Sequence, residues 1–254
     1  MIIDTHCHLY DEKLTESKSQ ILSDLKNNNY FAICSGDNLE NSAKCIELSS
    51  NNSNIYATVG VHPHEATSFD KDTINNLKLL AKNEKVVAIG EIGLDYYYDF
   101  SPRELQKEVL VRQIELANEL NLPCVFHVRE ATQDFLDIIK SLPFKVKGVV
   151  HSFSGSVEVA RYLTNYGLKL GVNGIVTFKN ANKIIEVVKA IDIDNLLIET
   201  DSPYLTPEPF RGKVNQPKYV ELVAKKIAQL KDISYQEVCD KTFQNAKKLF
   251  NLKI

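Results

Sequence analysis

The sequence lacks any excess of basic residues. Its 254 residues include 30 Lys and Arg against 33 Asp and Glu, which gives a formal net charge of −3. This balance argues against a broad electrostatic surface for DNA or for an anionic membrane. It still allows a substrate to be held at one local site.

Long apolar runs, a signal peptide and a disulfide framework are also lacking. No run of 18 apolar residues occurs, and the start Met1–His6 has neither a basic region nor an apolar core, so we expect no membrane partner. The cysteines at 7, 34, 45, 124 and 239 form no C-x-x-C pair, and an odd number at irregular spacing predicts reduced thiols in the cytoplasm. With no linker or low-complexity tract, we predict one domain over residues 1–254 and see no sign of an obligate protein partner.

Short apolar runs rich in β-branched residues recur eight times along the chain. They are Ile2–Thr5, Phe31–Cys34, Ile55–Val59, Val86–Ile89, Cys124–Phe126, Gly148–Val150, Leu168–Val172 and Leu196–Ile198. Continuous rather than alternating runs are typical of parallel strands buried on both faces, and helix-like stretches separate them. Eight such units in a chain of this length predict an α/β fold, the (β/α)8 TIM barrel. The seventh run is the weakest because Gly167, Gly171 and Gly174 lower its strand propensity, and seven strands would favour an open sheet.

Two of the intervening helices have recognisable beginnings. Ser101–Glu104 combines an N-cap serine, a proline and a capping-box glutamate, and Ser234–Glu237 repeats the capping box. The second motif precedes a final helix with an apolar face formed by Cys239, Phe243, Ala246 and Phe250.

Metal-binding residue types gather at the predicted strand ends. All six histidines, together with Glu91 and Asp201, lie at or just past the C-terminal end of a predicted strand; the histidines are His6, His8, His62, His64, His127 and His151. In a barrel these positions converge on one face, where the active sites of this architecture lie. We therefore expect residues far apart in sequence to meet in one site.

His6 and His8 form an H-x-H pair on an extended segment. Their side chains point the same way and can chelate one ion, although such a pair also occurs in ordinary surface or core strands. Cys7 points oppositely and is expected in the core, whereas Asp4 either orients a ligand or makes a structural hydrogen bond. With His127, His151, Glu91 and Asp201 the pair makes six candidate ligands. Six exceed what one tetrahedral ion needs, so two ions about 3.5–4 Å apart that share a carboxylate fit better.

The sequence resembles the TatD family of metal-dependent hydrolases. The motifs that carry the resemblance run along nearly the whole chain: Ile3–Leu9, Gly60–His64, Gly90–Tyr96, His127–Ala131, His151–Gly155 and Glu199–Leu205. The loop Phe210–Asn215 also matches, but Gln216 follows it where the family pattern usually has glutamate.

The resemblance implies a cofactor of two divalent metal ions. One ion would be bound by His6, His8 and Asp201, the second by His127 and His151, and Glu91 would bridge both. Imidazole-rich ligation favours zinc, manganese, iron or nickel, whereas family members are described as magnesium-dependent, so the identity of the metal stays open.

Catalytic roles are expected for Asp201, Glu91 and His62. Asp201 is the candidate general base for an attacking water, with a purely ligating role as the alternative. We interpret His62 as a contact to the substrate phosphate or leaving group and His64 as a weaker substrate contact; the alternative for both is packing at the barrel rim.

Other substrate-binding candidates follow the same strand ends. Arg129 either offers a bidentate fork to a phosphate or forms a rim salt bridge. Tyr96 is expected in the loop that shapes the pocket, and Tyr96–Tyr98 either stack on a base or pack ordinarily. Arg211 either caps the site or anchors its loop.

The residues alone predict a hydrolase, and the resemblance narrows this to a DNase. It implies a 3′–5′ exonuclease that hydrolyses single-stranded DNA with a water activated by two metal ions. The alternative is a D-aminoacyl-tRNA deacylase with the same dinuclear site, for which aminoacyl-tRNA would be the substrate. Cleavage of a small cyclic amide is less favoured, and the full ligand set argues against a non-catalytic binding barrel.

Overall fold

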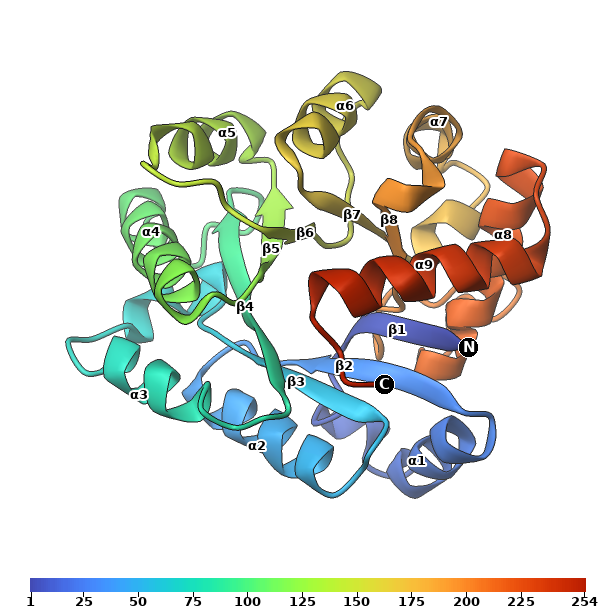
Figure 1. Ribbon diagram of the computed structural model, residues 1–254, viewed down its shortest axis with the longest axis horizontal. Coiled ribbons are helices and arrows are strands. Elements are labelled where there is room, and N and C mark those ends of the chain that lie inside the picture. The colour runs from blue at the N-terminus through green and yellow to red at the C-terminus, as the bar shows by residue number, and fades with distance from the viewer.

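Eight parallel strands surround the centre of the molecule, and helices cover the outside of the sheet (Figure 1). The computed structural model describes residues 1–254. The strands pair in chain order and are β1 (Ile2–Cys7), β2 (Tyr30–Ser35), β3 (Ile55–Val59), β4 (Val86–Asp95), β5 (Cys124–Arg129), β6 (Gly148–Val150), β7 (Lys169–Val172) and β8 (Leu196–Ile198). An isolated parallel bridge between Cys7 of β1 and Ser202, which follows β8, brings the two ends of the sheet together. The predicted (β/α)8 barrel is confirmed.

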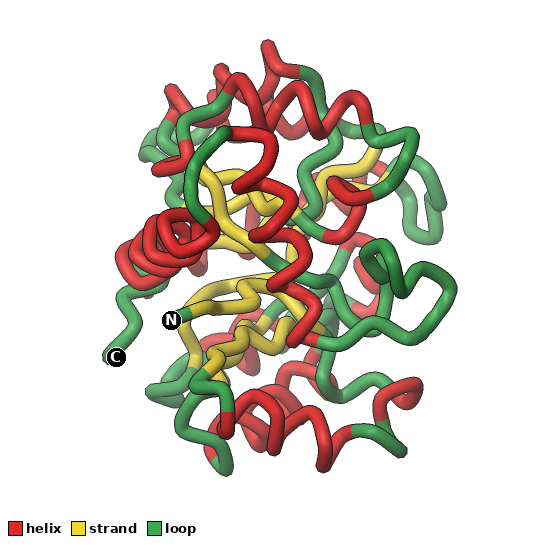
Figure 2. Tube along the Cα trace, turned by 90° about the vertical axis from the view of Figure 1, so that its right-hand side faces the viewer, coloured by secondary structure: helices red, strands yellow, loops and turns green.

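The helices occupy the crossovers between strands and the C-terminal end of the chain. They are α1 (Lys18–Asn27), α2 (Leu39–Ser50), α3 (Thr73–Leu80), α4 (Arg103–Leu120), α5 (Thr132–Ser141), α6 (Val157–Tyr166), α7 (Asn182–Ala190), α8 (Val220–Lys231) and α9 (Tyr235–Leu249). None of them is both long and apolar enough to cross a membrane. In Figure 2 both chain termini lie on the left, at the N-terminal face of the barrel, and long loops project on the right.

Four strands extend beyond the apolar runs that predict them. β1, β2, β4 and β5 end at Cys7, Ser35, Asp95 and Arg129, so that polar residues continue the strand. A search for apolar runs does not find these extensions, because their polar side chains contact one another instead of a hydrophobic core. The weakly predicted seventh strand does form, at Lys169–Val172.

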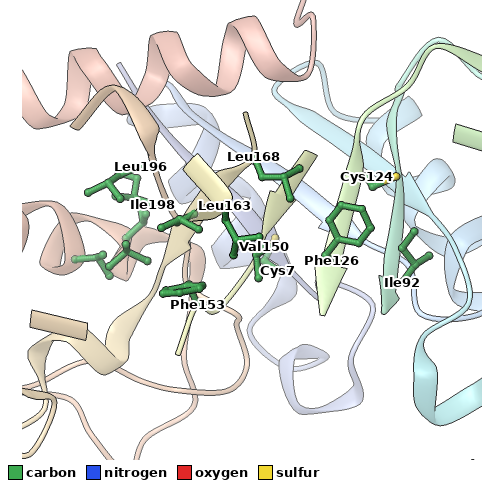
Figure 3. Close-up of a cluster of buried hydrophobic side chains, with 14 of the residues drawn as sticks. Cys7, Ile92, Cys124, Phe126, Val150, Phe153, Leu163, Leu168, Leu196 and Ile198 are labelled. Carbon is green, nitrogen blue, oxygen red and sulfur yellow. The ribbon is translucent and has the colours of Figure 1, made fainter. Parts of the chain in front are cut away.

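Two apolar layers hold the barrel together. Side chains between the strands and the outer helices form one layer, part of which Figure 3 shows, and Cys7 lies in it as expected. The other layer fills the barrel interior with residues such as Ile33 and Val125, on which Phe243 of α9 and Phe250, just after this helix, pack. In Figure 1 helix α9 crosses the N-terminal mouth of the barrel. All five cysteines are buried free thiols.

Of the two predicted N-cap serines, only Ser234 caps its helix. The Ser234 side chain accepts a hydrogen bond from the Glu237 amide at 3.0 Å and caps α9. The prediction for Ser101 is wrong, because α4 begins at Arg103 after Pro102 and has no side-chain cap. The Ser101 hydroxyl instead donates to the His64 carbonyl at 2.9 Å, which ties two loops together at the C-terminal face.

Candidate metal centre

Six side chains from five strand ends converge on one point at the C-terminal face of the barrel. They are His6 in β1, His8 just after it, Glu91 in β4, His127 in β5, His151 after β6 and Asp201 after β8. All are buried or nearly so. The structure thus brings together every residue that the sequence suggested as a metal ligand.

The Glu91 carboxylate lies at the middle of this cluster. Its Oε2 atom is 3.2 Å from His6 Nε2 and 3.8 Å from His8 Nε2. Its Oε1 atom is 2.8 Å from His151 Nε2 and 3.0 Å from His127 Nδ1. The two oxygens of one carboxylate therefore face two different pairs of histidines.

Asp201 completes the half of the cluster that contains the H-x-H pair. Its Oδ1 atom is 3.4 Å from His8 Nε2 and 3.8 Å from His6 Nε2, and these two nitrogens are themselves 3.3 Å apart. Its backbone has a left-handed φ of 58°, and its amide donates to the His6 carbonyl at 2.9 Å. An unusual backbone conformation fixed by the adjoining strand is a feature of functional sites.

The other half of the cluster contains buried nitrogen atoms without hydrogen-bond partners. Neither ring nitrogen of His151 makes a hydrogen bond of good geometry, although the side chain is only 4% exposed and the Glu91 and Glu199 carboxylates lie 2.8 Å and 3.4 Å away. One ligand atom each from His62, Glu91 and His127 lies within 4.8 Å of the others, and the same is true of His6, Glu91 and His151. These donor sets fit a divalent cation, which would satisfy the unpaired nitrogens.

His62 lies closer to this cluster than a rim position would place it. Its Nε2 atom is 3.4 Å from Glu91 Oε1, and its ring centroid is 4.5 Å from that of His127. Its Nδ1 atom accepts a hydrogen bond from the His64 amide at 3.1 Å, which places the proton of the neutral ring on Nε2. Burial lowers the pKa of His62 to about 4 despite the nearby Glu91 carboxylate. A neutral His62 thus presents an N–H donor to the centre.

Asp95 is a supporting residue whose role the sequence analysis missed. Its fully buried Oδ2 atom accepts hydrogen bonds from His127 Nε2 and His64 Nε2, both at 2.9 Å. The other ring nitrogen of His127, Nδ1, faces Glu91 Oε1 at 3.0 Å, on the side of the centre. A carboxylate that fixes the tautomer of a ligating histidine is a common arrangement in metal sites. The available signal was its position four residues after Glu91, on the same face of an extended strand.

Glu199 and Ser35 support the remaining histidines. Glu199 Oε1 lies 3.4 Å from His151 Nδ1 and accepts the Ser152 amide at 2.6 Å. The Ser35 carbonyl lies 3.1 Å from His8 Nδ1, and its hydroxyl lies 3.2 Å from His6 Nδ1. Each histidine that is a candidate ligand therefore has a neighbour that faces the nitrogen pointing away from the centre.

Asp4 makes the structural hydrogen bonds that were the alternative to orienting a ligand ring. Its carboxylate accepts bonds from the Thr200 amide at 2.8 Å and the Thr200 hydroxyl at 2.5 Å. It therefore fastens the end of β8, next to Asp201, to β1.

The carboxylates of the centre are held in their ionised form. Burial alone would raise the pKa of Glu91, but His151 and His6 bring it well below its usual value. Burial would likewise lower the pKa of His8, yet the hydrogen bond and charge of Asp201 raise it to about 9. The cluster therefore presents ionised oxygens, the form that binds a cation.

The outer candidate residues occupy different surroundings. The Tyr96 hydroxyl donates to Asp134 of α5 at 2.7 Å, and the guanidinium of Arg103 covers its ring. Tyr96 therefore links its loop to the outer helices. Arg211 lies over the Phe178 ring at 4.2 Å, as expected of a residue that anchors its loop.

Arg129 forms no rim salt bridge. Its guanidinium carbon lies 4.0 Å from the ring centroid of Tyr97 and 4.9 Å from that of Tyr98. The Tyr98 ring stacks on Phe100 at 5.2 Å, and His64 touches both rings edge-on. We call Tyr97, Tyr98 and Phe100 the aromatic shelf; their exposed fractions are 54%, 47% and 66%. An exposed aromatic surface thus adjoins the candidate metal centre.

Comparison with known proteins gives consistent matches along nearly the whole chain. A family model described as TatD related DNase matches residues 3–251. The uncharacterised metal-dependent hydrolase YabD of Bacillus subtilis (strain 168) is 44% identical over 254 residues, which cover 99% of this chain and 100% of YabD. YcfH of Escherichia coli (strain K12), another uncharacterised metal-dependent hydrolase, is 35% identical over 260 residues, covering 99% of this chain and 96% of YcfH.

A solved structure shows the same fold. The crystal structure of YjjV, a TatD homologue from Escherichia coli K12, superposes with a TM-score of 0.91 at 30% identity, covering 99% of this chain and 98% of YjjV. The chain therefore belongs to the TatD family and is a metal-dependent hydrolase built on a (β/α)8 barrel.

Proposed function

We propose that the protein is a deoxyribonuclease that releases nucleotides from the 3′ end of single-stranded DNA. The observation that carries this proposal is the Glu91 carboxylate, whose two oxygens face two separate groups of metal-binding side chains. Two metal ions that share one carboxylate are a recurrent arrangement in nucleases and phosphatases. The matching family description supports DNA as the substrate.

His6, His8 and Asp201 would hold one cation, His127 and His151 the other, and Glu91 both. Bound divalent cations supply Lewis acidity, which polarises a phosphoryl oxygen and lowers the pKa of a water molecule towards 7.

Asp201 is the carboxylate best placed to accept the proton of the attacking water. Its side chain is 15% exposed, whereas that of Glu91 is 4% exposed, so Asp201 lies nearer to solvent and substrate. Its pKa is lowered, because the hydrogen bond from His8 and the nearby histidines outweigh the effect of burial. Asp201 is therefore an ionised base at neutral pH.

His62 is suited to binding a developing negative charge on oxygen. Its neutral ring carries the proton on Nε2, 3.4 Å from Glu91 Oε1. That donor can shift to a phosphate oxygen or to the leaving oxygen. His64, bound to Asp95, would then act mainly by holding the His62 ring through its backbone amide.

The aromatic shelf favours single-stranded DNA, whose bases are unpaired, as the substrate. Its exposed rings offer a stacking surface to any base, and each stacked base contributes about 1–3 kcal/mol. The adjoining Arg129 guanidinium is free of carboxylate partners and can contact a phosphate.

The test is digestion of end-labelled oligonucleotides by the metal-loaded protein. We expect stepwise loss of nucleotides from the 3′ end of single strands, and loss of at least about 100-fold in rate for Glu91→Gln, together with reduced metal content. Glu47→Gln, which changes an exposed glutamate of α2, is the matched control.

Activity that survives both metal removal and Glu91→Gln would contradict the proposal. If oligonucleotides stay intact while a D-amino acid is released from charged tRNA, the same centre is an esterase and the deacylase alternative holds.

A further inference from the structure

A cavity of about 520 Å³ lies at the N-terminal face of the barrel, opposite the metal centre. The starts of β3 to β6 form one side of it, and the last turn of α9 with the C-terminal tail forms the other. Figure 1 looks onto this face, with the C-terminal end of α9 in front of the barrel. None of its lining residues belongs to the metal centre.

Four lysines line this cavity, which we call the N-face pocket. Lys85 immediately precedes β4, Lys147 precedes β6, and Lys248 and Lys253 lie at the end of α9 and in the tail. Glu84 is the one acidic residue among the lining residues. A chain of net charge −3 therefore carries a local excess of three positive charges at this place.

The pocket lysines have no carboxylate partners. No ion pair involves any of the four. Lys85 Nζ donates to the Ser53 carbonyl at 2.8 Å, and Lys147 Nζ donates to Asn121 Oδ1 at 3.3 Å. Burial lowers the pKa of Lys85, so an anion placed beside it would compensate the cost of its charge.

Apolar side chains form the floor of the pocket. Tyr56, Val87, Pro123 and Phe250 line it and are buried in the fold, so the floor is fixed by the core. The volume falls within the roughly 300–1,000 Å³ of small-molecule sites and exceeds what an inorganic ion needs. A ligand that fits has an organic body and a head with more than one negative charge.

We propose that the N-face pocket binds a phosphorylated small molecule of nucleotide size. Several lysines around one concavity match a phosphate, which carries close to two charges and takes Lys as a common partner. A monocarboxylate would leave most of the lysines unmatched. This site is independent of the proposed nuclease function, because it shares no residue with the metal centre.

The experiment is calorimetric titration of the purified protein with ATP, adenosine and inorganic phosphate as probes. We expect ATP to bind at least about 10-fold more tightly than either of the other two, because only ATP has both parts. The variant K85Q/K147Q/K248Q should lose at least 10-fold in affinity for ATP. K26Q/K183Q/K189Q removes three exposed lysines of α1 and α7 and is the charge-matched control, in which binding should persist.

Two further variants separate folding and the metal centre from the pocket. K147E/K248E leaves Lys85 on the Tyr56 ring, changes only exposed side chains and should also lose binding. Glu91→Gln should keep ATP binding, since the metal centre lies at the other face. Equal affinity in the pocket and control variants would overturn the proposal, as would inorganic phosphate binding as tightly as ATP, which would show an adventitious anion only.

Discussion

At the scale of single residues, the metal centre depends on side chains that never touch the substrate. Asp95, Glu199 and Ser35 face the outer nitrogens of the histidines that are candidate ligands. That these histidines would meet at one face could be predicted from the sequence, because histidines are few and all lie at or just past the end of a predicted strand. Asp95 and Glu199 could not, because a carboxylate near a strand end has no distinguishing pattern until the fold shows what it faces.

Asp95→Asn tests this supporting role. The amide has one oxygen and no charge to replace a carboxylate that accepts two imidazole N–H groups and two backbone amides. We expect a 10- to 100-fold loss in metal affinity or activity, the range usual for partners of ligating histidines. Metal titration followed by fluorescence or calorimetry measures it, with exposed Asp240→Asn as the control. Unchanged metal affinity and activity would show that Asp95 only shapes its loop.

Tyr98→Ala tests the aromatic shelf. Removing a ring that stacks on Phe100 and is 47% exposed should raise KM for single-stranded oligonucleotides about 10-fold, since stacking contributes about 1–3 kcal/mol per base. The rate on a small phosphodiester without bases should stay the same. Tyr162→Ala, at an exposed tyrosine of α6, is the control. An equal loss on both substrates would place Tyr98 in the support of the metal centre instead.

At the scale of elements, polar strand ends and glycines are where sequence and structure differ most. The apolar pattern located every strand but ended β4 at Ile89, six residues before the structure does. The glycines that weaken the seventh run have separate physical reasons. Gly167 ends α6 with a left-handed φ of 108°, while Gly171 lies inside β7 against Glu199. Strand propensity alone cannot predict that a position needs glycine because a side chain from another strand occupies the space of its Cβ atom.

Gly171→Ala follows from that contact. A Cβ atom at this position would lie 2.3 Å from Glu199 Oε2, too close for either group to stay in place. We expect a loss of about 1–3 kcal/mol in the free energy of unfolding and a fall in activity as Glu199 leaves His151. Urea denaturation measures the first effect and oligonucleotide digestion the second.

The double-mutant cycle with Glu199→Ala provides the control. Without the Glu199 carboxylate there is space for the Cβ atom at position 171. In the Glu199→Ala background, Gly171→Ala should therefore cost little free energy of unfolding. Additive losses would mean that the strain arises elsewhere in β7.

At the scale of the whole molecule, charge sets the manner of substrate binding. With a net charge of −3, we expect contacts to the phosphates of a DNA substrate to be limited to the metal centre and Arg129. Two or three phosphate contacts on a single strand give a salt slope no steeper than about −2 in a logarithmic plot of kcat/KM, whereas a long basic track gives a far steeper one. Initial rates on one oligonucleotide at several salt concentrations measure the slope. A steep slope would reveal a DNA-binding surface that the charge balance argues against.

Phe243 of helix α9, together with Phe250, closes the N-terminal mouth of the barrel interior, and this limits how a substrate can reach the metal centre. The interior below the ligands is solid, so nothing passes through the barrel from one mouth to the other. A polymer can reach the metal centre only from the C-terminal face and must leave from the same face. Under the proposed function, this closed floor is compatible with a free 3′ end that enters from the C-terminal face and leaves by the same face.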